Sequence, residues 1–184
     1  MKTATKKAVP SWIDVKSCLT DFDRAGLIAL VQDLYTASKD NQTFLHTRFA
    51  LSEDVLKPYK ATLDRWLCPR WEKNENTSVA KAKKAISDYK KAIGLPEGLA
   101  ELMVFYCERA ADFSYEFGLQ DEGYFYALVR MFEQALKTID PLPDAKRQEF
   151  ITRLSTVCRI SYNFGYGVGG DMGVLLAEYA DNVE

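Results

Sequence analysis

Histidine is almost absent from this sequence, since His46 is the only one in 184 residues. Four cysteines lie about forty to fifty residues apart and form no Cys-x-x-Cys pair, the spacing that zinc and redox sites use. We therefore expect no metal and no cofactor. The thiols are interpreted as free and buried, because most of them fall among apolar residues at helical spacing; they are Cys18, Cys68, Cys107 and Cys158.

Long apolar runs are also missing. No window approaches the roughly eighteen consecutive apolar residues of a membrane span, so we expect no membrane partner. Lys2, Lys6 and Lys7 stand before Pro10 with no apolar run behind them, which argues against a signal peptide. Residues 1–10 are interpreted as a disordered basic tail, and free thiols favour a cytoplasmic location.

Charge is unevenly distributed along the chain, although the net charge is only −2. Residues 1–95 hold seventeen Lys or Arg against eleven Asp or Glu, whereas residues 96–184 hold seven against fifteen. Such an asymmetry indicates electrostatic recognition of a partner and not a particular chemistry.

Apolar residues recur at intervals of three and four in most of the chain, and no alternating strand pattern persists. Ser11 and Asp14 have the spacing of a capping box, and Ser52 is a candidate cap for a helix that ends before Pro69. The sequence predicts an all-α bundle of about seven helices with no sheet, in one domain over residues 11–184. Its basic half is 11–95 and its acidic half 96–184.

A helical repeat is the alternative architecture. Ala127 to Ala135 faintly resembles the second helix of a tetratricopeptide unit, but the chain shows no 34-residue self-similarity. A single bundle is therefore preferred over a repeat array.

Residues 165–170 match the pattern Gly-x-Gly-x-x-Gly. In a dinucleotide site this pattern joins a strand to a helix, whereas here a predicted helix precedes it. We interpret the glycine-rich segment 165–173 as a helix terminus that serves packing or mobility and not nucleotide binding.

Acidic and nucleophilic residues give two weak catalytic candidates. Glu108, Asp112 and Glu116 share one helix face and could hold a cation, although a solvated acidic face is the preferred interpretation. His46 could act as a base for Cys68, Cys107 or a serine, but nothing in its neighbourhood supports that role.

Lysines off the apolar stripe of residues 79–93 form the strongest candidate surface for nucleic acid. The candidate basic residues are Lys73, Lys81, Lys84 and Lys91. Asp88 interrupts this face, and base-reading arginines are missing from it, so an ordinary solvated helix face is preferred.

Several aromatic residues are neighbours in the sequence, so their side chains cannot all point into one core. Adjacent residues of a helix point in different directions, so at least one ring of this set should be incompletely buried and available to a partner. The candidate interface aromatics are Trp66, Trp71, Tyr124 and Tyr126.

Two segments carry a resemblance to known proteins: Ala80–Lys91 (AKAKKAISDYKK) and Tyr166–Asp171 (YGVGGD). With them, most of residues 14–180 resembles a bacterial all-helical family catalogued only as a domain of unknown function. The resemblance implies a bacterial source and an all-α fold, and it supplies no activity and no catalytic residues.

These observations favour a non-catalytic protein-protein interaction or regulatory module, which would bind a protein partner or a second copy of the chain. The alternative is an accessory nucleic-acid-binding protein that uses the lysine-rich helix. A carboxylate-based enzyme is the third possibility.

Overall fold

The computed structural model describes residues 9–73 and 75–180. These residues form nine α-helices and one 3-10 helix without a strand, which confirms the all-α class and exceeds the expected seven helices. Contacts divide the chain into two units, Met1–Leu45 and His46–Glu184, whereas the sequence predicts one domain over 11–184. Most of the predicted basic tail lies outside the described residues.

Unit 1 contains α1 (Trp12–Leu19), α2 (Arg24–Ala37) and most of α3 (Lys39–Arg48). The backbone N–H of Ser11 donates to Asp14 Oδ2 at 2.6 Å, as the capping pattern predicts. Asp23 caps α2 by accepting the N–H of Gly26 at 2.7 Å. Both helices thus begin where local side chains satisfy their first N–H groups, yet neither contains a buried residue.

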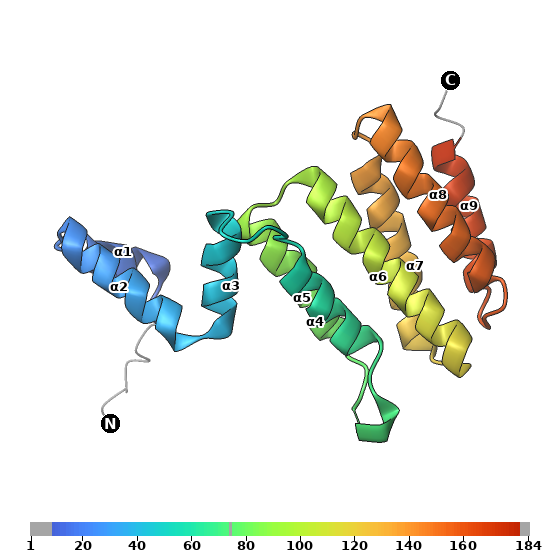
Figure 1. The fold of residues 1–184 in the computed structure, drawn as a ribbon, viewed down its shortest axis with the longest axis horizontal. Helices are drawn as coiled ribbons and strands as arrows, with labels where there is room; N and C mark the ends of the chain where they lie inside the picture. Colours follow the sequence, from blue (N-terminus) through green and yellow to red (C-terminus); the bar gives the residue numbers. More distant parts are fainter. Residues whose placement is uncertain (1–8, 74, 181–184) are drawn as a thin grey trace, which may run out of the picture. The chain divides into compact units, whose positions relative to one another are not determined.

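Unit 2 consists of three antiparallel helical pairs that stack in chain order (Figure 1). The pairs are α4 (Lys57–Leu67) with α5 (Val79–Ala92), α6 (Pro96–Phe117) with α7 (Glu122–Ile139), and α8 (Asp144–Ser161) with α9 (Val168–Ala180). The first helix of each pair packs on the first helix of the next, and α5 also packs on α6. Helices from the basic and acidic halves therefore lie against each other.

The pairs do not begin at equal spacing, which explains why the sequence shows no fixed repeat; their first residues are Lys57, Pro96 and Asp144. The predicted start at Ser52 is wrong. Asp54 Oδ1 accepts the N–H groups of Leu56 and Lys57 at 2.9 and 3.2 Å, so α4 begins at Lys57.

The core lies along α6 and α7. On α7 the apolar residues at helical spacing are at most 1% exposed: Phe125, Leu128, Phe132, Leu136 and Ile139. The 3-10 helix η1 (Trp71–Lys73) lies in the connection between α4 and α5. Two thiols, Cys107 and Cys158, are buried as expected, whereas Cys18 in unit 1 is exposed.

α9 is a helix where the sequence predicts a glycine-rich terminus. A Cβ on Gly169 would lie 2.6 Å from the Cα of Tyr162, and one on Gly173 would lie 2.7 Å from the Tyr162 hydroxyl. The glycines thus let α9 approach the end of α8, which supports the packing interpretation. Just before α9, Tyr166 and Gly167 both adopt positive φ.

No described helix combines the length with the apolar character that a membrane span requires.

Candidate functional site

An ionic ladder crosses the first helices of the three pairs in unit 2. Lys60 of α4 contacts Glu101 of α6 with Nζ and Oε1 2.6 Å apart. Arg153 of α8 donates from Nη1 to Glu101 Oε2 at 2.5 Å and from Nε and Nη2 to Glu108 at 2.7 Å each. The ladder joins α4, α6 and α8 and pairs a cation of the basic half with an anion of the acidic half.

Partial burial strengthens this ladder. Burial opposes ionisation of Glu101, but hydrogen bonds from Arg153 and Lys60 outweigh it and lower the pKa of Glu101 below 4.5. Hydrogen bonding to Glu108 raises the pKa of Arg153. The ladder thus stays charged at neutral pH, which suits positioning of helices better than proton transfer.

The predicted acidic face is therefore only partly solvated. Glu108 is held by Arg153, and Arg109 Nη1 lies 3.8 Å from Asp112 Oδ2. Desolvation raises the pKa of Asp112; the charge of Arg109 opposes this shift, and the nearby charges of Glu108 and Glu116 add to it. Among the described residues no group of three or more His, Cys, Asp or Glu is placed to hold a metal.

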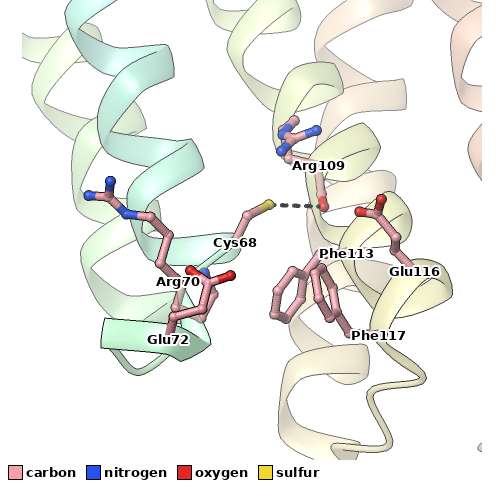
Figure 2. A pocket seen from close by; sticks show the side chains of 8 residues that line it. Cys68, Arg70, Glu72, Arg109, Phe113, Glu116 and Phe117 are labelled. Carbon is pink, nitrogen blue, oxygen red and sulfur yellow. Dashed lines mark hydrogen bonds between the residues drawn. The ribbon is translucent and has the colours of Figure 1, made fainter. Parts of the chain in front are cut away.

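A small pocket opens between the end of α4 and the C-terminal half of α6 (Figure 2). Its lining consists of Cys68, Pro69, Arg70, Glu72, Arg109, Phe113, Glu116 and Phe117. Its volume of about 170 Å³ is below the roughly 300–1,000 Å³ of small-molecule sites, so it accommodates about one side chain.

The thiol at this pocket stays protonated at neutral pH. Burial raises the pKa of Cys68 to about 11, and its Sγ donates to the Arg109 carbonyl oxygen at 3.4 Å. Cys107 is fully buried, and burial raises its pKa as well. A thiolate is the nucleophile in cysteine catalysis, so neither cysteine suits a reaction that uses exposed His46 as base.

The structure places the four candidate lysines in different surroundings. Lys73 is exposed in η1, and Lys91 is exposed at the end of α5. Lys84 Nζ lies 2.5 Å from Asp88 Oδ2. Lys81 Nζ stands 3.8 Å from the centroid of the Trp66 ring. Two of the lysines therefore already contact groups of their own chain.

The four candidate aromatic residues also differ in how far they are buried. Tyr124 is 4% exposed and its hydroxyl donates to the Leu67 carbonyl oxygen at 3.0 Å, so it offers no surface to a partner. Trp66 is half-buried beneath Arg65 and Lys81. Tyr126 is 62% exposed, which confirms that one ring of the set is incompletely buried. The side chain of Trp71 lies outside the described residues.

Unit 1 exposes an apolar surface on α2, although the spacing of these apolar residues in the sequence predicts a core-facing helix. On α2 the exposed residues Leu27, Ile28, Val31 and Leu34 recur at i, i+1, i+4 and i+7, which places them on one side of the helix. We call these four residues the α2 arc. Trp12 and Ile13 of α1 are 68% and 76% exposed. The signal in the sequence was the run Leu27–Val31, which is apolar on more sides than one core contact needs.

Arg153 is the other functional residue that sequence reasoning missed. It pairs with α6 residues about fifty positions earlier, and only the stacking of α8 on α6 brings them together.

No family model, curated protein or solved structure matches this chain. The resemblance to a bacterial helical family therefore stays a prediction.

Proposed function

We propose that this protein is a non-catalytic interaction module, in which unit 1 recruits a protein partner and unit 2 is the stable scaffold. The observation that carries the proposal is the contrast in burial: α1 and α2 contain no buried residue, yet they present large apolar side chains to solvent. Contiguous apolar surface of this kind marks protein contact sites in folded chains.

Unit 2 supports the proposal through the ion pairs that connect its helices. The ionic ladder connects α4, α6 and α8, and each of its charged groups forms an ion pair with another member; the members are Lys60, Glu101, Glu108 and Arg153. Of the three acidic residues considered for catalysis, Glu108 is thus paired with Arg153, and Asp112 lies near Arg109. The interaction role is favoured over catalysis on this ground.

The test is site-specific photo-crosslinking in extracts of the source cells. A photoreactive residue replaces Ile28 on the α2 arc or, as a matched control, Val174, which is 63% exposed on α9. We expect a discrete protein adduct from position 28 that disappears when Leu34 is also changed to Asp. Equal or absent labelling at both positions would contradict the proposal.

A second candidate function is weak nucleic-acid binding, favoured by α5, which carries five lysines against one aspartate. Lysine side chains on such a helix can neutralise phosphates, but the ion pair of Lys84 with Asp88 reduces the positive charge available to them.

A further inference from the structure

We propose that the α2 arc binds the α2 arc of a second copy of this chain, so that two α2 helices pair antiparallel about a twofold axis. The inference rests on the proposed function and names its partner. It follows from the positions of the apolar residues, the charge on the arc and the area of the exposed surface.

The α2 arc is self-complementary under a twofold axis. Leu27 and Leu34 lie equally far from the midpoint between Leu30 and Val31. In an antiparallel pair centred there, Leu27 of one copy opposes Leu34 of the other, and Val31 lies close to the axis. Leu27, Val31 and Leu34 then each lie opposite an apolar residue of the other copy, as an isologous interface requires.

Charge on the arc also fits this pairing. Arg24 precedes Leu27, Ile28 and Val31 by three, four and seven residues, so it lies on the same side of α2. Arg24 and Ala37 are the two ends of the helix, and the last turn of α2 has no basic residue. Antiparallel pairing brings each Arg24 to the C-terminal end of the other α2, whose partial negative charge favours a cation.

Asp33 does not obstruct the contact, because it falls on the side of α2 opposite the arc by the same helical spacing. Asp23 precedes Leu27 by four residues, but its carboxylate caps α2 by accepting the N–H of Gly26. A lipid surface is a poorer occupant, because interfacial helices carry Lys and Arg beside their apolar face. Residues 12–37 instead hold four aspartates against Lys16 and Arg24.

The apolar area exposed by α1, α2 and the turn between them is of the size that a stable dimer needs. Eight apolar side chains of this segment are at least 39% exposed: Trp12, Ile13, Val15, Phe22, Leu27, Ile28, Val31 and Leu34. At roughly 100 Å² each, given that large aromatics bury about 150–250 Å² in full, they present on the order of 800 Å². Standard specific interfaces bury about 800 Å² per partner.

Disulfide trapping of the full chain tests this geometry. Cys18 is first changed to Ser because it is exposed, and Val31→Cys is compared with Val174→Cys in that background. Under a mild glutathione redox buffer we expect Val31→Cys to form a covalent dimer that reductant reverses, while Val174→Cys stays monomeric. Equal crosslinking of the two variants would overturn the inference.

Sedimentation of the purified wild type and Val31→Asp provides the second measurement. We expect a wild-type dimer that the substitution converts to a monomer with unchanged helical content, since Val31 belongs to no core in its own chain. If the purified wild type stays monomeric up to about 100 μM, self-pairing is overturned, because most specific complexes have a lower dissociation constant than that. If Ile28 still crosslinks another protein in extracts, the proposed function survives that result, so the two failures are distinguishable.

Discussion

The helices α2 and α7 contain similar apolar residues, but only α7 buries them. On α7 Phe125, Leu128 and Phe132 are at most 1% exposed, while Arg130 and Lys137 face solvent. On α2 Ile28 and Leu34 are 59% and 52% exposed. The difference lies in the neighbours, because α7 packs between α6 and α9 whereas no part of α2 is buried. Apolar content alone therefore does not create a core, and the unburied apolar residues of α2 are the reason for proposing a partner.

The largest expected effect separates two matched leucines. Leu128→Ala in α7 should lower the free energy of unfolding by about 2–5 kcal/mol, because it leaves a cavity at a fully buried position. Leu34→Ala in α2 should change it by less than about 0.5 kcal/mol at low protein concentration. Urea unfolding of unit 2 helices measures both variants. Equal losses of the free energy of unfolding would contradict the difference in burial between α7 and α2.

A second pair of variants tests the close approach of α9. Gly169→Ala places a Cβ 2.6 Å from the Tyr162 Cα and should cost about 1–3 kcal/mol. Gly170→Ala meets nothing within 4 Å and should be neutral or stabilise the helix by up to about 1 kcal/mol. Thermal unfolding compares them, and a tolerated Gly169→Ala would show that packing does not require this glycine.

The ionic ladder predicts a pH-dependent difference. Glu101→Gln should lower the free energy of unfolding by about 1–2 kcal/mol at pH 7, since charge-assisted hydrogen bonds to Arg153 and Lys60 are weakened. The pKa of Glu101 is lowered on folding, so its stabilisation is complete above about 4.5 and is lost as pH falls through the folded-state value.

Denaturant unfolding between pH 3 and 7 measures this gap, and Glu149→Gln at an exposed surface pair is the control. A gap that stayed constant down to pH 3 would rule out the ionised Glu101 as its source.

The smallest effect concerns the lysine surface of unit 2. Changing Lys81, Lys84 and Lys91 to Glu should leave the partner contact of unit 1 intact, because these residues lie on α5. We expect wild-type binding to DNA or RNA with a Kd no tighter than about 10 μM, in the range of non-specific electrostatic binding. Fluorescence anisotropy across a salt series checks this, and submicromolar binding lost in the triple variant would favour the nucleic-acid function.

Periodicity predicted most of the helices, because apolar stripes such as that of α7 and breaks such as Pro96 are local signals. The helix α9 was not predicted, since three of its thirteen residues are glycines, and the role of Gly169 and Gly173 depends on the approach of Tyr162. The division into two units was not predicted either. Hydrophobic spacing shows that a face needs covering, but only the packed structure shows whether the chain itself covers it.

The candidate site was predicted less well. The sequence placed Lys81 on a surface but gave no sign that its ammonium group lies over the Trp66 ring. It took Glu108 as part of a solvated face, because the approach of Arg153 requires the stacking of α8 on α6. Contacts between distant elements decide both cases, and local patterns do not report them.

Hydrogen exchange of the full chain at two protein concentrations tests the central claim most directly. In dilute solution, where sedimentation shows a monomer, we expect amides of α1 and α2 to exchange at least tenfold faster than those of α6 and α7, because local stability follows burial. At high concentration the α2 amides should become protected while those of α6 and α7 remain unchanged. Strong protection of α2 in the dilute monomer would contradict the account, because it would mean that unit 1 needs no partner.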